Sequence, residues 1–340
     1  MSAPETTSPK QRTGKTFQIA LFCAALAWSV SSRLLSSSSA EGITNRFNAD
    51  WATPILGALF LLFLLAVGYS LLDVIARRSA SAHESLGLPN RPTALREWLI
   101  GAALGWGMVL LAVLPMMLAG DLHVSSWFQP RAFLVLLLNL AVIALVSLAL
   151  ETIYRGYPFR RLIDAIGPVA ATIGMSILFA IVRAIEDGAS RSAVLIAFLS
   201  GIVFSIAWFR THGMWLGWGM RFGWMASMGV VFGLPVSGYD FTSIIQTTTV
   251  GRSWLTGDDY GPEGSLCMIV ALIAGLVVLV RVSRQYAWDY THPPIVPGGY
   301  PMDIAPPPAH AAMEQAATPS LVQILPNTPQ GRSLDEPPAS

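Results

Sequence analysis

Eight apolar runs that contain few charges constrain this chain more than any other feature of its sequence. The runs are Thr16–Ser32, Trp51–Leu72, Trp98–Gly120, Ala132–Leu150, Ala165–Val182, Ser192–Phe209, Gly213–Pro235 and Gly264–Val280. A helix needs about 20 apolar residues to cross the hydrocarbon core of a bilayer, within a range of roughly 17–25. In lipid, backbone polar groups must be satisfied within the chain, and no segment alternates like a strand of a membrane barrel. The sequence therefore predicts an all-α, polytopic membrane helix bundle with about eight transmembrane helices.

Composition indicates lipid as the solvent of this chain and argues against nucleic acid as a partner. Charged residues make up 12% of the sequence and hydrophobic residues 53%, whereas a soluble globular protein carries about 25% charged residues. The net charge is only +1, and no run of basic residues offers a surface for phosphates. We expect membrane lipid to be a partner and nucleic acid not to be one.

The distribution of Lys and Arg between the runs predicts the orientation of the chain. The first run ends in Arg33 and a serine tract without a clear small-residue cleavage site. We therefore expect a retained span rather than a cleaved signal peptide. With the N-terminus in the cytoplasm, most loop arginines fall on the cytoplasmic side, as the positive-inside rule requires. This pattern predicts a multi-pass protein of the cell membrane with both termini in the cytoplasm.

Three regions follow one another along the chain. Residues 1–84 hold an N-terminal cytoplasmic segment and two spans, residues 85–285 form the membrane core, and residues 286–340 form a tail. The tail is rich in Pro, Ala, Ser and Thr and has no helical apolar period. Such a composition is typical of disordered segments, so we expect a disordered cytoplasmic tail.

Ionisable residues inside the spans mark candidate functional positions, because each costs about 2.5–3.5 kcal/mol on insertion scales. Glu151 and Arg155 lie one turn apart at the end of the fourth run, so they share a helix face. Arg221 stands in the middle of the seventh run, which predicts that it is buried. For Arg155, Arg160 and Arg161 we expect interfacial positions, with the guanidinium groups at the lipid headgroups.

The fourth and fifth runs predict a helical hairpin with its break at Gly167-Pro168. Glu151 and Arg183 are equally far from this break along the sequence, so an antiparallel hairpin brings them to similar depth. This arrangement requires the fourth helix to continue to about Ile166. We expect Glu151 and Arg183 to form a buried pair.

Three short motifs stand in order between the fourth and seventh runs. Leu150–Gly156 has the sequence LETIYRG, Phe179–Arg183 has FAIVR, and Trp215–Met225 places Arg221 six residues after a tryptophan. They resemble the EExx[FY]RG, FxxxH and HxxxN motifs of the CPBP intramembrane proteases. That family includes the type II CAAX prenyl endopeptidases and the ABI proteins linked to bacteriocin self-immunity. Three further segments are similar to ones common in bacterial members: Leu86–Leu88, Gly233–Gly238 and Gly261–Ser265. The resemblance covers roughly residues 85–282.

The positions that the resemblance assigns to catalysis differ in this chain. In the family, the first glutamate of the pair and the first histidine are thought to activate a water. The second histidine and the asparagine help to stabilise an oxyanion, and the family is usually described as metal-dependent. These four positions hold, in the same order, Leu150, Arg183, Arg221 and Met225. The charged residues that remain from the first motif are Glu151 and Arg155.

These residue types do not suit hydrolysis at a metal. Leucine cannot act as a base toward water, and a catalytic zinc takes about three protein ligands from His, Cys or carboxylate. Arginine stays protonated and has no lone pair to offer a metal. We expect the histidines in loops or the tail, away from the family positions: His83, His123, His212, His292 and His310. No cofactor is expected, and zinc would be the cofactor only if the family activity is retained.

Three functions of different classes remain open on the sequence. The first is a non-catalytic pseudoprotease that acts in binding or regulation, with a membrane protein or peptide as a candidate partner. The second is an active intramembrane metal-dependent endopeptidase that uses Glu151 as its base. The third is a transporter or channel whose buried charges line a polar path, although the sequence shows no internal repeat.

The arginines also lead to a hypothesis about the site itself. The guanidinium groups of Arg183 and Arg221 would occupy the space of the missing metal and share Glu151 as their counter-charge, with Arg155 one turn away. Arginine suits this role because its planar fork binds a carboxylate through two hydrogen bonds. Three arginines against one glutamate leave a positive surplus, which predicts a cavity that binds anions.

Overall fold

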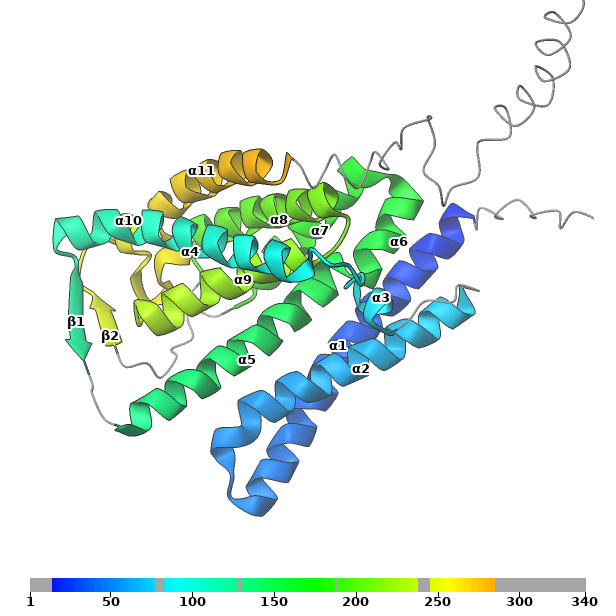
Figure 1. Ribbon diagram of the computed structural model, residues 1–340, viewed down its shortest axis with the longest axis horizontal. Helices are drawn as coiled ribbons and strands as arrows, with labels where there is room; N and C mark the ends of the chain where they lie inside the picture. The colour runs from blue at the N-terminus through cyan, green and yellow to red at the C-terminus, as the bar shows by residue number, and fades with distance from the viewer. Residues whose placement is uncertain (1–13, 77–81, 127–129, 187–188, 238–244, 285–340) are drawn as a thin grey trace, which may run out of the picture. The chain divides into compact units, whose positions relative to one another are not determined.

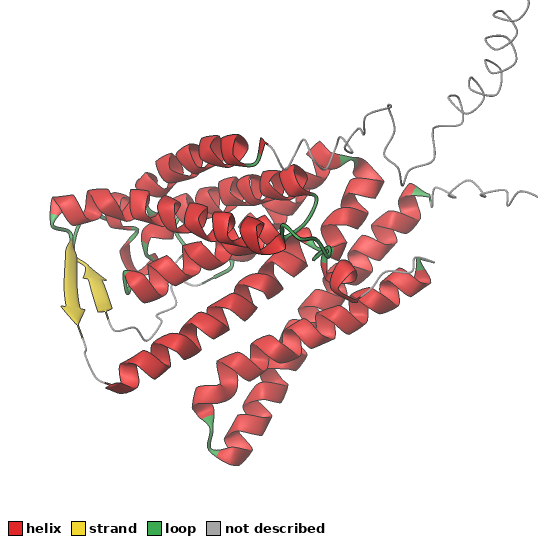
Figure 2. Cartoon of the chain, in the orientation of Figure 1, coloured by secondary structure: helices red, strands yellow, loops and turns green. Residues whose placement is uncertain are grey.

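A computed structural model shows a helical protein over residues 14–76, 82–126, 130–186, 189–237 and 245–284, which are the residues that the structure describes. Helices fill most of this part of the chain, together with one pair of short strands (Figure 2). The longer helices are α1 (Lys15–Phe47), α2 (Thr53–Ile75), α4 (Ala94–Ala119), α5 (Pro130–Arg155), α7 (Pro168–Ala184), α8 (Arg191–Thr211), α9 (Trp215–Ala226) and α11 (Leu266–Val282). The shorter helices are α3 (Ala82–Leu86), α6 (Tyr157–Ile166) and α10 (Ser253–Thr256).

Each of the predicted apolar runs forms a helix, which fits an all-α membrane bundle. Among the described residues, five segments have the length and composition to cross a membrane: α1, α2 with the turn before it, α4, α5 with α6, and α8. Both α7 and α11 are apolar but have 17 residues each, at the lower end of the spanning range. Helix α9 has 12 residues and continues as a π-helical turn, Ser227–Val231. The number of eight spans therefore stays a prediction.

A short antiparallel ribbon links two loops of the helical fold (Figure 1). Strands β1 (Leu122–Ser126) and β2 (Ile245–Thr249) pair with the first residue of one opposite the last residue of the other. The apolar runs did not predict this ribbon, because five residues are too few to establish an alternating pattern. It places His123 in a strand, and His83 lies in α3. The expectation that both histidines lie in loops was therefore wrong.

Two glycines shape the chain around the fourth and fifth runs. Gly156 is the only residue between α5 and α6, so helical structure continues to Ile166 with one break. Gly167 has a φ of 88°, a left-handed conformation that glycine adopts without steric cost. Helix α7 then begins at Pro168. The predicted continuation to Ile166 and the predicted break at Gly167-Pro168 are both confirmed.

Helix α9, which carries Arg221, packs against α4 with very close backbones. A Cβ added at Gly105 would lie 2.0 Å from the carbonyl oxygen of Met220, and one added at Gly223 would lie 2.0 Å from that of Ala102. Backbone atoms cannot move aside as the tip of a side chain can, so only glycine permits this approach. The contact fixes the position of α9 and hence of Arg221.

A buried ion pair ties α2 to α6. Arg161 Nη2 lies 2.6 Å from Asp73 Oδ1, and Ser85 Oγ donates to Asp73 Oδ2 at 2.8 Å. The guanidinium group also lies over the ring of Tyr157, 4.5 Å from its centre. Arg161 is only 1% exposed, so the interfacial position expected for it was wrong, because it has a carboxylate partner inside the fold. Its neighbour Arg160 is half-buried and donates to two backbone oxygens of α3.

The predicted tail, residues 286–340, lies outside the described residues, together with His292 and His310. The same is true of residues 1–13. The division of the chain at residues 84 and 285 and the cytoplasmic position of both termini therefore stay predictions.

Candidate functional site

Two charged residues in the last turns of α5 begin the site. Arg155 Nη1 lies 3.2 Å from Glu151 Oε1, and each residue is 1% exposed. Arg155 Nη2 also donates to the backbone oxygen of Gly201 in α8 at 3.0 Å. The shared helix face is confirmed. The interfacial position expected for Arg155 was wrong, because its guanidinium group turns into the bundle and finds a carboxylate and a carbonyl there.

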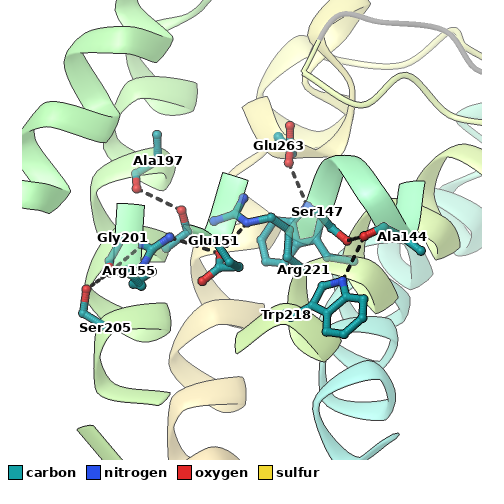
Figure 3. Close-up of polar contacts among 12 residues, drawn as sticks. Ala144, Ser147, Glu151, Arg155, Ala197, Gly201, Ser205, Trp218, Arg221 and Glu263 are labelled. Carbon is teal, nitrogen blue, oxygen red and sulfur yellow. Dashed lines mark hydrogen bonds and ion pairs between the residues drawn. The ribbon is translucent and has the colours of Figure 1, made fainter. Parts of the chain in front are cut away.

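Arg221 brings a second guanidinium group to the same carboxylate oxygen. Its Nε lies 2.5 Å from Glu151 Oε1, so a residue of α9 bonds to a residue of α5 (Figure 3). Arg221 is 6% exposed, which confirms its predicted burial. Charge-assisted hydrogen bonds of this kind are about twice as strong as neutral ones. Glu151 is therefore fixed between Arg155 and Arg221.

Gly217 makes room for this carboxylate on the surface of α9. A Cβ added at Gly217 would lie 3.1 Å from Glu151 Oε2, closer than ordinary van der Waals contact. Gly217 precedes Arg221 by one helical turn, so both face α5. Glu151 Oε2 thus lies against the backbone of α9, while Glu151 Oε1 accepts hydrogen bonds from both guanidinium groups.

Arg183 pairs with a different carboxylate from the one predicted. Its Nη1 lies 2.7 Å from Glu186 Oε2, three residues further along the chain, and no hydrogen bond or ion pair joins it to Glu151 among the described residues. The expected Glu151–Arg183 pair was therefore wrong, because a carboxylate one turn away is nearer. Tyr260 OH donates to the same Glu186 oxygen at 3.3 Å, and burial raises the pKa of Tyr260 to about 12.

The three arginines lie around two phenyl rings, although they form ion pairs with different carboxylates. The guanidinium carbons of Arg155, Arg183 and Arg221 lie 5.9, 5.2 and 5.3 Å from the centre of the Phe179 ring. Arg221 and Arg155 also lie 4.5 and 5.3 Å from the centre of the Phe204 ring. Cations within about 6 Å of a ring centre are attracted by its negative face. The three arginines at family positions therefore form one cationic cluster around an aromatic centre.

Glu263, which the sequence analysis did not assign to the site, approaches from the turn Pro262–Gly264. Its Oε1 accepts a hydrogen bond from Trp224 Nε1 at 2.7 Å, and its Oε2 accepts one from Ser237 Oγ. The family resemblance marked the segment Gly261–Ser265 that contains Glu263 but gave this residue no role, and it reaches the site from a part of the chain distant in sequence. Glu186 carried a weak signal, since it lies three residues after Arg183 at helical spacing.

A small cavity lies beside these side chains. Its volume is about 20 Å³, enough for one or two water molecules. Glu151, Glu186 and Glu263 accompany the three arginines here, so the predicted positive surplus was wrong. The lining combines charged and aromatic residues, among them Phe179, Arg183, Phe204, Arg221, Tyr260 and Glu263.

The remaining family positions, Leu150 and Met225, contribute no polar group. Leu150 packs against two hydrophobic clusters, and Met225 belongs to the larger of them and is 8% exposed. Both side chains therefore provide apolar packing at positions where the family motifs carry polar residues.

The donor atoms around this site do not fit a catalytic metal. The two histidine positions of the family motifs hold arginines, which have no lone pair to donate. Glu151 Oε1 already accepts two guanidinium groups. Across the part of the chain that the structure describes, no group of three or more His, Cys, Asp and Glu side chains could hold a metal ion. A catalytic zinc takes about three such ligands, so these residues do not provide a zinc site.

Comparison with known proteins supports the family resemblance over part of the chain. The sequence model of the family described as Type II CAAX prenyl endopeptidase Rce1-like matches residues 129–227. Over this segment the chain is Rce1-like, which confirms the family resemblance. The segment holds all six family-motif positions but ends before Glu263. No curated protein and no solved structure matches the chain.

Proposed function

We propose that the chain is a non-catalytic CPBP-type membrane protein whose protease-like site serves binding or regulation. The observation that carries the proposal is the 2.5 Å contact between Arg221 Nε and Glu151 Oε1. It brings a permanent positive charge onto the one glutamate that remains of the carboxylate pair in the family motif.

The chemistry of peptide hydrolysis argues against Glu151 as a working base. Such a base must take a proton from water, yet Glu151 Oε1 accepts hydrogen bonds from Arg155 and Arg221. A water at this oxygen would displace a buried guanidinium group, and breaking a buried ion pair costs about 3–5 kcal/mol. The other oxygen, Glu151 Oε2, lies against Gly217 of α9. Leu150 offers no second carboxylate to share the task. The rival function, an endopeptidase that uses Glu151, needs this network to open.

A membrane protein or peptide, together with lipid, is the partner that the surface suits best. Ile173, Ile177 and Ile181 lie one turn apart along α7 and are 45%, 45% and 51% exposed. An apolar stripe of this kind fits lipid chains or the apolar face of another membrane helix. We assign binding rather than cleavage of such a partner to this protein.

The proposal is tested by a cleavage assay with the purified full-length chain in liposomes. A set of fluorogenic apolar peptides is incubated with the wild type and with Glu151→Gln, each with and without the metal chelator phenanthroline. We expect equal background signal in all four samples. Cleavage by the wild type that both the chelator and Glu151→Gln abolish would show an active endopeptidase and overturn the proposal.

A further inference from the structure

Arg221, which lines the cavity beside the ion-pair network, carries a buried hydrogen-bond donor that the described chain does not use. Arg221 lines the cavity and contributes its Nε to Glu151. Its Nη2 is buried and has no hydrogen-bond partner among the residues that the structure describes. A buried donor on a charged group destabilises the folded state when it has no hydrogen-bond partner, and a bound acceptor removes this cost. An acceptor placed in the cavity would have this effect.

A second guanidinium group borders the same cavity from another helix. Arg183 on α7 and Arg221 on α9 both lie over the ring of Phe179, 5.2 and 5.3 Å from its centre. Both also line the cavity. Donors from two helices therefore approach one small space, an arrangement that suits an oxyanion.

The size of the cavity and its apolar lining residues indicate which class of anion it could bind. A cavity of about 20 Å³ is small, which favours a compact headgroup such as a carboxylate over a bulkier phosphodiester. Ile196, Phe204 and Trp224 supply apolar wall, which suits hydrocarbon next to the headgroup. The planar fork of arginine matches a carboxylate through parallel N–H···O bonds.

We propose that this cavity binds a single carboxylate group, with Arg221 as the principal ligand and Arg183 as the second. The carboxylate comes either from a fatty acid in the membrane or from a small soluble acid. This inference rests on the proposed function, because it names the ligand class of a site that binds rather than cleaves.

Glu263 places a negative charge beside the proposed ligand site. It lines the cavity, and Trp224 and Ser237 hold its two oxygens. Its negative charge opposes a ligand carboxylate near Arg183. The substitution Glu263→Gln replaces the carboxylate with a neutral amide of the same size and removes this repulsion. We therefore expect Glu263→Gln to bind the ligand more tightly than the wild type.

The test uses the full-length chain in dodecyl maltoside micelles with dodecanoate labelled with ¹³C at its carboxyl carbon. We expect a shifted carboxyl resonance that saturates at one ligand per chain, with dodecanol unable to compete. Arg221→Lys keeps the charge beside Glu151 but loses the fork, and should weaken binding about tenfold or more. Arg210→Lys is the matched control, because Arg210 bonds to Ser283 and to the backbone of α11 away from the cavity.

The outcomes separate the sources of the ligand and the two proposals. Displacement by millimolar acetate would assign the site to a small soluble acid, and displacement by unlabelled dodecanoate alone would assign it to a fatty acid. The absence of a saturable resonance, or equal binding by Arg221→Lys and Arg210→Lys, would overturn the inference. Weaker binding by Glu263→Gln would overturn it as well, even if Arg221→Lys fails to fold. None of these results depends on cleavage, which tests the proposed function separately.

Discussion

The substitution Glu151→Gln gives the sharpest test of the charged network in the site. Glu151 and Arg155 are each 1% exposed and Arg221 is 6% exposed, so the change leaves two buried guanidinium groups without a counter-charge. Removing one partner of a buried ion pair costs about 3–5 kcal/mol. We expect a loss of this size in the free energy of unfolding, measured by denaturant titration of the detergent-purified chain.

The matched control for this experiment is Glu186→Gln. Glu186 pairs with Arg183, but its side chain is 20% exposed, so solvent screens the loss and the cost should be about 1 kcal/mol or less. Adding Arg155→Met and Arg221→Met to Glu151→Gln should restore part of the stability, since apolar residues of similar size often replace buried ions well. Equal stability of Glu151→Gln and the wild type would refute the buried network.

Three further predictions follow from the structure. Gly105→Ala should destabilise the chain by about 1–3 kcal/mol through a clash between α4 and α9, whereas Gly107→Ala, with no atom within 4 Å of the added Cβ, should be neutral or stabilising in the same denaturant titration. The pKa of Tyr260 rises from 10.0 to about 12 on burial, so its neutral form stabilises the fold fully below pH 10, and this contribution disappears as the pH rises to about 12. Thermal melting should therefore show a loss of stability over that interval that is smaller in Tyr260→Phe, and identical pH profiles would contradict this assignment. Reporter fusions at Ser340 and near Thr256 should report opposite sides of the membrane, and the same side would refute the predicted topology.

The elements of the fold were predictable because each depends on local sequence. A run of about 20 apolar residues leaves the backbone little choice in lipid other than a helix, and Gly167-Pro168 breaks a helix wherever it stands. The pairing of Glu151 with Arg155 follows from helical spacing alone. The proximity of Arg221 to Glu151 came from the family motifs, which place both residues at the same site.

The partners of the other charged residues depend on contacts that local sequence does not encode. Arg161 follows the fourth apolar run, a position typical of an interfacial arginine, but it forms an ion pair with Asp73 of α2. Glu263 enters the site from a turn near the start of α11. Arg183 pairs with Glu186 rather than with Glu151, because equal depth along a hairpin does not fix which carboxylate a guanidinium group meets.

Metal analysis of the purified full-length chain tests the central claim most directly. The wild type is equilibrated with zinc, passed over a desalting column and measured for zinc per chain by mass spectrometry. The comparison is a variant that carries the four residues of the family motifs, Leu150→Glu, Arg183→His, Arg221→His and Met225→Asn. We expect far less than one zinc per wild-type chain, because Arg183 and Arg221 stand where histidine ligands would be and Glu151 is bound to two guanidinium groups. One zinc per wild-type chain, held as tightly as in the four-residue variant, would contradict this account of the site.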